Sequence, residues 1–332
     1  MPFMPRVLLL GATGETGSSI LDGLLESNKY EVEILVRASS VGKKAVMDIQ
    51  DRGVKVRVAD LTASEDELAL VLSGIDILVS AIAAQDQAAQ KNLMRAAKMA
   101  GIQRVIPCAY ATIAPPQGVM LFRDEKEEVY NEIKRLALPY TIIDVGFWHQ
   151  LSFPRVPSGR ADYAVLLQDS TTIHGDGEAP NILSDLRDVG RYVARIIADD
   201  RTLNRHVYGW SDILTETEIF GIVEELSGEV IEREYISSQQ LEADLKRASA
   251  EHAKNLEDPA KRLGFYILQT LYSKYVRRDN QPSYAKYLGY LDARELYPDF
   301  VPISFRDFFA EVLAAEAKRP YAHLTVPKTL EH

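Results

Sequence analysis

The segment VLLLGATGETG, residues 7–17, constrains the fold of this chain more than any other segment. Its four apolar residues at 7–10 are enough for a buried strand and far too few for a membrane span. They run directly into Gly11, Gly14 and Gly17, and apolar residues at helical spacing follow. A glycine turn between a strand and a helix lets backbone N–H groups at the helix start face a phosphate. The segment therefore predicts a dinucleotide-binding strand–turn–helix unit.

Strand and helix patterns alternate through the first 150 residues. Continuous apolar runs predict further strands at 31–37, 54–58, 76–82, 104–108 and 140–145. Amphipathic spacing predicts helices at 65–72, 87–100 and 124–136. Strands that alternate with helices favour a doubly wound parallel sheet. We therefore predict an α/β fold whose residues 1–150 form a Rossmann-type NAD(P)-binding domain.

The pattern changes after Gly146, and glycine and proline interrupt the periodicity through residue 180. Helical spacing returns at 185–198, 216–226, 239–256 and 262–275. We expect residues 151–329 to form a smaller α+β substrate region, partly interleaved with the first domain. Residues 330–332 resemble the start of an affinity tag and are left out of the functional argument.

Composition narrows the range of partners. The chain carries 48 acidic and 38 basic residues, and this net charge of −10 disfavours nucleic acid and anionic membrane surfaces. Cys108 is the only cysteine, so no internal disulfide can form, which is typical of a cytoplasmic protein. The histidines lack the paired spacing of metal ligands, and no metal is expected. A small-molecule substrate and a monomer or homodimer are the remaining expectation.

The end of the second predicted strand distinguishes NAD from NADP. An acidic residue there binds a ribose 2′-hydroxyl, whereas an arginine accommodates a 2′-phosphate. This chain has Arg37 at that place, and Lys44 follows in the next predicted loop. We therefore expect the cofactor to be NADPH or NADP⁺.

Several segments together resemble the NmrA-like and isoflavone-reductase-like group of atypical short-chain dehydrogenases. In the first half they are residues 7–17, 35–37, 53–61, 96–110 and 138–148. Residues 173–205 and 296–309 are similar to the fungal branch of this group, which serves secondary metabolism. The resemblance is more specific in the first half of the chain.

The resemblance implies a set of cofactor-binding residues. The phosphate turn would comprise Gly11, Thr13, Gly14, Glu15, Thr16 and Gly17. Arg37 and Lys44 would hold the 2′-phosphate. The adenine and ribose side would be lined by Ala81, Ile82 and Ala83. The nicotinamide would pass beside Val145, Gly146 and Phe147.

The resemblance also implies a catalytic lysine, thirteen residues before the proline of an IPYT-like motif. With Pro139 as that proline, the match is Lys126, which would bind the nicotinamide ribose and lower the pKa of a proton donor. Tyr130 and Lys134 spell the common dehydrogenase tyrosine–lysine pair, but they lie one turn too close to Pro139. Phe122 occupies the family's tyrosine position and cannot donate a proton.

The proton donor is therefore open. His149 and Tyr110 are the first candidates, and Tyr130 stays in reserve because it is one helical turn from Lys126. Trp148 and His149 are expected to contact substrate. Residues 108–110 read Cys-Ala-Tyr where plant reductases of the group carry Ser-Glu-Phe, which disfavours plant-type phenylpropanoid substrates.

Three functions fit these residues. The first is an NADPH-dependent reductase of a small aromatic or heterocyclic metabolite, acting on a carbonyl, imine or activated alkene. The second is a redox-neutral cyclase or isomerase in which the nucleotide is structural. The third is an NmrA-type regulator that senses nucleotide. A shared fold alone does not separate them.

Overall fold

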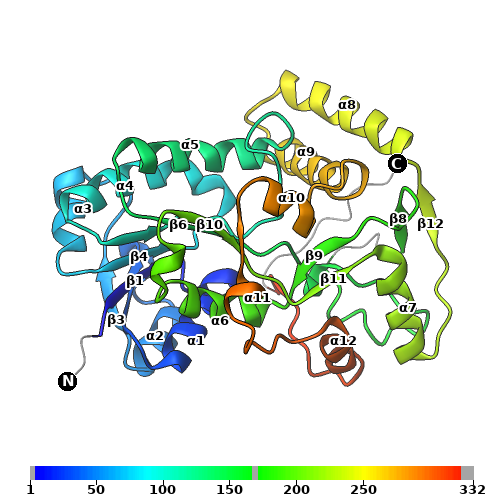
Figure 1. Ribbon diagram of the computed structural model, residues 1–332, viewed down its shortest axis with the longest axis horizontal. Coiled ribbons are helices and arrows are strands. Elements are labelled where there is room, and N and C mark those ends of the chain that lie inside the picture. The colour runs from blue at the N-terminus through cyan, green and yellow to red at the C-terminus, as the bar shows by residue number, and fades with distance from the viewer. Residues whose placement is uncertain (1–3, 167–170, 323–332) are drawn as a thin grey trace.

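The computed structural model describes residues 4–166 and 171–322, and a parallel sheet lies at its centre (Figure 1). Five strands lie in the order β3 (Lys55–Val58), β2 (Glu31–Val36), β1 (Arg6–Leu10), β4 (Ile77–Ser80) and β5 (Arg104–Ile106). A parallel bridge between Val105 and Tyr140 connects β5 to three more parallel strands, β6 (Thr141–Asp144), β10 (Arg205–Tyr208) and β13 (Leu291–Asp292). The strand order reverses between β1 and β4, which places a ligand crevice at their carboxyl ends.

Helices cover both faces of this sheet (Figure 1). One face carries α1 (Glu15–Ser27), α2 (Lys44–Asp51) and α6 (Leu186–Ile196). The other carries α3 (Glu65–Leu72), α4 (Gln90–Met99) and α5 (Leu121–Arg135). Short 3₁₀ turns lie at Ala38–Ser40, Ala84–Ala89, His149–Leu151 and Asp200–Thr202. The α/β Rossmann-type fold expected from the sequence is confirmed.

The apolar run of β1 is continuous because both faces of the strand are buried. Val7 and Leu9 pack into the core on the α1–α6 face, and Leu8 and Leu10 pack into the core on the α3–α5 face. Side chains alternate between the two faces of a strand, so four successive apolar residues serve two cores at once.

Helices α1 and α6 touch backbone to backbone, although they lie far apart in the sequence. A Cβ atom on Gly190 would lie 1.7 Å from the Ser19 carbonyl oxygen, and one on Gly23 would lie 2.3 Å from the Gly190 carbonyl oxygen. The Ser19 hydroxyl donates to the Leu186 carbonyl at 2.5 Å and accepts from the Gly190 N–H at 2.9 Å. The contact therefore requires glycine on both helices and fixes α6 against the dinucleotide-binding unit.

The rest of the chain forms a smaller α+β region. Its strands are β7 (Phe147–Trp148), β9 (Asn181–Ser184) and β11 (Asp212–Leu214) in one sheet, with β8 (Thr172–His174) and β12 (Glu234–Ile236) paired separately. Its helices are α7 (Glu216–Ser227), α8 (Ser238–Lys254), α9 (Pro259–Leu271), α10 (Pro282–Tyr287), α11 (Ala293–Leu296) and α12 (Phe305–Leu313). This region has a core of its own, separate from the two cores of the main sheet, which contains Phe153, Phe220, Phe305, Phe308 and Phe309.

Two local structures differ from the sequence-based expectation. Lys44 begins helix α2 and does not lie in a loop. The helix expected over 262–275 begins earlier, at Pro259, and α9 passes into a π-helical turn, Tyr272–Val276. The division into residues 1–150 and 151–329 stays a prediction, and residues 330–332 lie outside the described part. Within the described residues, no helix is long and apolar enough to cross a membrane.

Candidate active site

The glycine turn between β1 and α1 is shaped by close backbone contacts. Gly11 has a φ of +78°, and a Cβ atom there would lie 2.2 Å from the Ala81 carbonyl oxygen. A Cβ atom on Gly17 would lie 1.9 Å from the Gly11 carbonyl oxygen. Gly14 is the N-cap of α1, and no side chain caps the helix there. The first N–H groups of α1 therefore have no side-chain cap, which fits a pyrophosphate at the helix start.

The remaining turn residues differ in what their side chains meet. Thr13 is exposed and Thr16 is half-buried. The Glu15 carboxylate accepts the Tyr321 backbone N–H at 2.7 Å. The Tyr321 ring in turn stacks on Trp148, with ring centroids 6.0 Å apart. A segment near the C-terminus thus lies between the phosphate turn and Trp148, and it covers one face of the predicted substrate-contacting tryptophan.

The three residues after β4 lie beside this turn. The Ala81 backbone is the one that Gly11 approaches, and the Ile82 carbonyl accepts from the Cys108 thiol at 3.3 Å. Ala81 and Ile82 are half-buried and Ala83 is exposed. The ends of β1, β4 and β5 are therefore in contact with one another, as a dinucleotide crevice requires.

Arg37 and Lys44 are both exposed, but their surroundings differ. Within the described residues the Arg37 guanidinium makes no hydrogen bond, and it lies close enough to Asp60 to help lower the pKa of that carboxyl group, after the hydrogen bonds from Thr62. The Lys44 ammonium is paired with Asp48 at 2.7 Å, one turn along α2. Arg37 is therefore the better placed of the two to bind a phosphate.

Lys126 points from α5 to the carboxyl end of β5. Its Nζ donates to the Cys108 carbonyl at 2.8 Å and to the Ala109 carbonyl at 2.9 Å, and the residue is 1% exposed. The same atom lies 4.3 Å from the Phe122 ring centroid. Burial lowers the pKa of this ammonium. The structure thus brings Lys126 to the edge of the sheet where the ends of β1 and β4 also lie.

The alternative tyrosine–lysine pair lies elsewhere on α5. Lys134 is exposed. Tyr130 is 1% exposed in the core between α5 and the sheet, and its hydroxyl has no hydrogen-bond partner among the described residues. Burial raises the pKa of Tyr130 well above its ordinary value. This placement favours Lys126 over the pair as the group that meets a ligand.

A buried polar network, missed by the sequence reasoning, holds α5 against β6. Arg123 donates to the Asp144 carboxylate at 3.0 Å and to the Tyr290 hydroxyl at 2.9 Å. Tyr290 donates to the same carboxylate at 2.8 Å, and Asp144 is completely buried. A single aspartate in an apolar strand was the available signal, because a buried carboxylate requires a partner. The network positions Lys126 relative to the end of β6.

The segment after β6 carries the residues expected beside the nicotinamide. Val145 is completely buried, and Phe147 is half-buried. Gly146 has a φ of +67°, and a Cβ atom there would lie 2.2 Å from the Ile182 carbonyl oxygen. The close approach that requires glycine at this position is therefore made by β9.

Tyr110 follows β5, and its buried hydroxyl makes no hydrogen bond to the described residues. Its φ of +46° is uncommon for a residue other than glycine, and such strain is frequent at functional sites. It is 7% exposed, and its hydroxyl has no hydrogen-bond partner among the described residues. Burial raises its pKa well above the ordinary value, so the hydroxyl keeps its proton at neutral pH. Tyr110 stays a candidate donor.

His149 lies in the core of the second region. It is completely buried, and its ring centroid is 5.5 Å from that of Phe305 and 6.0 Å from that of Phe308, both on α12. Burial lowers its pKa to about 4, so the ring is neutral near pH 7. This placement argues against the expected roles of His149 as proton donor and substrate contact, because α12 packs over the ring.

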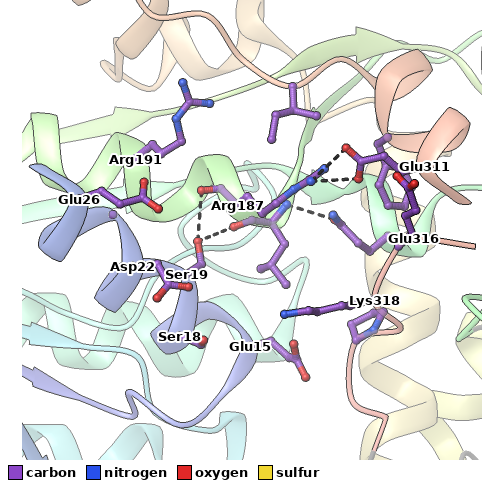
Figure 2. Close-up of a pocket in the computed structure, with 17 residues that line it drawn as sticks. Glu15, Ser18, Ser19, Asp22, Glu26, Arg187, Arg191, Glu311, Glu316 and Lys318 are labelled. Carbon is purple, nitrogen blue, oxygen red and sulfur yellow. Dashed lines mark hydrogen bonds and ion pairs between the residues drawn. The ribbon is translucent and has the colours of Figure 1, made fainter. Parts of the chain in front are cut away.

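A cavity of about 580 Å³ lies beside the phosphate turn, between α1, α6 and α12 (Figure 2). Among the predicted cofactor-binding residues, only Glu15 lines it. Arg187 reaches across from α6 and pairs with Glu311 of α12 at 2.9 Å. The cavity therefore flanks α1 and does not lie over the ends of β5 and β6. In residues 4–166 and 171–322 no cluster of three or more side chains could hold a metal ion.

Comparison with known proteins agrees with this arrangement. The sequence profile of the NmrA-like family matches residues 4–303. A protein of Aspergillus novofumigatus named asnovolin J 5′,6′-dehydrogenase is 40% identical, over 93% of this chain and 95% of its own. A protein of Arabidopsis thaliana named probable pinoresinol-lariciresinol reductase 3 is 26% identical, over 93% of this chain and 97% of its own.

Solved structures show the same fold. The complex of leucoanthocyanidin reductase with NADPH from Vitis vinifera has a TM-score of 0.77 at 19% identity, and covers 93% of this chain and 99% of its own. A structure of pinoresinol-lariciresinol and phenylcoumaran benzylic ether reductases has a TM-score of 0.77 at 24% identity, with the same coverage. The glycine turn, the buried lysine and these matches agree that the chain belongs to the NmrA-like family.

Proposed function

We propose that this protein is an NADPH-dependent oxidoreductase that acts on a small aromatic or heterocyclic secondary metabolite, at a carbonyl, imine or activated alkene. The observation that carries the proposal is the buried Lys126 ammonium, held by two backbone carbonyls at the sheet edge where the phosphate turn also lies. The named relatives support it, since they are a dehydrogenase and several reductases.

The residues present fit NADPH. Gly11 and Gly17 keep the turn free of Cβ atoms, the start of α1 would receive the pyrophosphate, and Arg37 would receive the 2′-phosphate. The bound nicotinamide would supply or accept the hydride. Lys126 would bind the nicotinamide ribose and hold a positive charge beside the reacting atoms.

The direction of hydride transfer has two candidates. The reductase relatives favour transfer to the substrate. The relative at 40% identity is named a dehydrogenase, which favours transfer from the substrate to NADP⁺. The same residues serve both directions, because a site that stabilises a transition state does so for the forward and the reverse step.

Cofactor binding is tested first by titrating the protein with NADPH and with NADH. We expect NADPH to bind several-fold more tightly, because Arg37 would face the 2′-phosphate. Arg37→Asp should abolish or reverse this preference. The control is Arg52→Asp, which makes the same charge change at an exposed arginine paired with Asp22. Equal affinities for the two nucleotides in the unaltered protein would contradict this assignment of Arg37.

Turnover is tested by incubating the protein with either form of the cofactor and a ring-containing pathway intermediate. The nicotinamide absorbance and the product mass are followed together. We expect one nicotinamide to be oxidised or reduced for each product molecule. A product formed without any change in the nicotinamide would favour the redox-neutral cyclase or isomerase. Nucleotide binding without any product would favour the nucleotide-sensing regulator.

A further inference from the structure

A second buried lysine lies in the π-helical turn that follows α9. Lys274 is 2% exposed, and its Nζ lies 3.6 Å from the centroid of the Phe147 ring and 4.6 Å from that of Tyr275. Phe147 directly follows Gly146 at the carboxyl end of β6. This π-helical turn ends the helix that α9 begins, and π-helical turns are frequent at functional sites. Here the turn brings Lys274 to the residue expected beside the nicotinamide.

The ammonium of Lys274 has no acceptor in the described part of the chain. It makes no hydrogen bond and no ion pair there, although an ammonium carries three donors. Glu216, the first residue of α7, acts in the opposite direction to burial and raises the pKa of Lys274. Burial lowers the pKa of Lys274 to about 7. A buried cation without an acceptor costs free energy, so its presence calls for an explanation.

The groups around Lys274 hold Glu216 in other bonds. The Glu216 carboxylate accepts the His174 backbone N–H at 2.8 Å, and its other oxygen lies 2.9 Å from His174 Nδ1. The Tyr275 ring stacks on His174, with ring centroids 4.7 Å apart, and burial together with the Glu216 carboxylate raises the pKa of the Tyr275 hydroxyl. Glu216 is therefore bonded to His174 of β8, and the three donors of the Lys274 ammonium remain for another acceptor.

Residues on either side of the π turn contact the rest of the protein. Asn280 accepts the Ile113 N–H at 3.1 Å and donates to the Ile182 carbonyl at 3.0 Å. Two helical turns before Lys274, the Tyr266 ring lies 5.5 Å from that of Phe122, against which the Lys126 ammonium packs. Helix α9 and the π turn thus form one wall that extends from Lys126 to Phe147.

We propose that Lys274 is a substrate-binding catalytic residue whose ammonium donates a hydrogen bond to an oxygen atom on the ring of the substrate. This inference rests on the proposed function and adds to it a substrate class: a flat ring that bears a carbonyl, enol or phenol oxygen. The substrate ring would lie beside Phe147, whose ring face the Lys274 ammonium already covers, with its oxygen at that ammonium.

The proposed step balances in the direction of reduction. Bound NADPH would supply a hydride to the carbon of a ring carbonyl, and the electron pair of the broken C=O π bond would move to the substrate oxygen. The Lys274 ammonium donates its proton to that oxygen, and the neutral amine regains a proton from water. A group that titrates near neutral pH suits this exchange, because it gives and regains a proton with similar ease. Lys274 would supply the proton that Phe122 cannot.

The test uses 4-nitrophenol as a probe, because its phenol and phenolate forms absorb differently. The full-length protein is titrated with the probe, with and without NADP⁺, and the ionisation of the bound probe is followed against pH. We expect the unaltered protein to favour the phenolate. Lys274→Met should weaken phenolate binding by about tenfold to a hundredfold, the loss of a hydrogen bond to a charged group. Lys274→Arg, which keeps the charge, should restore part of this affinity.

The matched control is Lys246→Met on α8, an exposed lysine that should leave probe binding unchanged. NADPH affinity and melting temperature are measured for every variant, and both should show that Lys274→Met is folded and binds the nucleotide. Equal phenolate binding by Lys274→Met and the unaltered protein would overturn the proposal, as would failure of the unaltered protein to bind the probe. Failure of the unaltered protein to bind NADPH would instead contradict the proposed function and leave the probe result valid.

Discussion

Lys126 and Lys274 are both almost completely buried, but their surroundings treat the positive charge differently. The Lys126 ammonium donates to two backbone carbonyls and packs on one aromatic ring. The Lys274 ammonium packs on two aromatic rings and has no hydrogen-bond acceptor in the described residues. Burial lowers the pKa of both, and it lowers that of Lys274 to about 7. Carbonyl acceptors stabilise the charged form, whereas ring faces offset less of the desolvation cost.

The two lysines are therefore suited to different roles. A lysine held by fixed carbonyls is suited to orient a bound group and to keep its charge through a reaction. A lysine without acceptors is suited to exchange a proton near neutral pH. Variants of the two lysines should therefore differ in which property they change, turnover for Lys126 and the pH dependence of stability for Lys274.

The largest effect is expected for Lys126→Met. Turnover should fall by about 10²- to 10⁴-fold, the range for a group that acts in the transition state, while the free energy of unfolding changes far less. Steady-state kinetics and thermal unfolding measure the two quantities. The control is Lys134→Met, which removes an exposed lysine from the same helix. Near-normal turnover in Lys126→Met would show that the lysine register against Pro139 is wrong.

The next largest effect is a change in the free energy of unfolding with pH, caused by Lys274. The pKa of Lys274 is about 7 in the folded protein and 10.5 in a free lysine, so the unfolded chain binds the proton more readily between these values. Stability should therefore rise with pH across this window, by up to about 1.4 kcal/mol per pH unit from this group. Lys274→Met should lack that slope and be more stable than the unaltered protein at pH 7 and below. Denaturant unfolding between pH 6 and 10 measures this, and identical slopes would place the Lys274 charge in a better-solvated site.

A smaller change in stability with pH, again caused by burial of a titratable side chain, is expected for His149. Burial lowers its pKa to about 4 from an ordinary value of 6.5, so the folded protein resists its protonation. Stability should fall as the pH drops from 6.5 towards 4. His149→Phe keeps a ring against Phe305 and Phe308, and should lose less stability over this window. If the two proteins unfold alike at every pH, His149 takes up its proton freely in the folded state.

The smallest effect is expected for Tyr130→Phe. Its hydroxyl is buried without a partner among the described residues, so removing it should change the free energy of unfolding little and leave turnover close to normal. Paired kinetics of Tyr130→Phe and Lys126→Met decide between the two readings of α5. Complete loss of activity in Tyr130→Phe would make Tyr130 the proton donor and would move the catalytic register by one turn.

The dinucleotide-binding unit could be predicted from the sequence because its signals are local. A buried strand, a glycine turn and an amphipathic helix follow one another within residues 6–27, and the structure has them as β1 and α1. Lys126 could be predicted only through the family resemblance, from its spacing to Pro139. The charged residues around it in the sequence give no sign of a functional role. Helix α2 was missed because its eight residues bury only Val46 and Ile49.

The structure of the second region depends on contacts between residues that are far apart in the sequence, so local patterns predict less of it. Strands of two to four residues, such as β13 and β10, carry too little pattern to be recognised. Lys274 lies in a helix rich in aromatic residues, and its burial depends on a π turn that no local signal announces. His149 follows Trp148 at once, yet the short 3₁₀ turn that it begins directs it to α12. Such side-chain directions are set by packing, which spacing in the sequence does not record.

The contact between α1 and α6 has a consequence for recombination among relatives. Gly23 and Gly190 come from opposite halves of the chain, and each helix leaves room for the other only while both lack a side chain. A chimera that takes its first half from one relative and its second half from another inherits the two positions from different parents. Crossovers at residue 150 should therefore yield folded hybrids only when the first parent carries glycine at position 23 and the second carries glycine at position 190, whatever their overall identity.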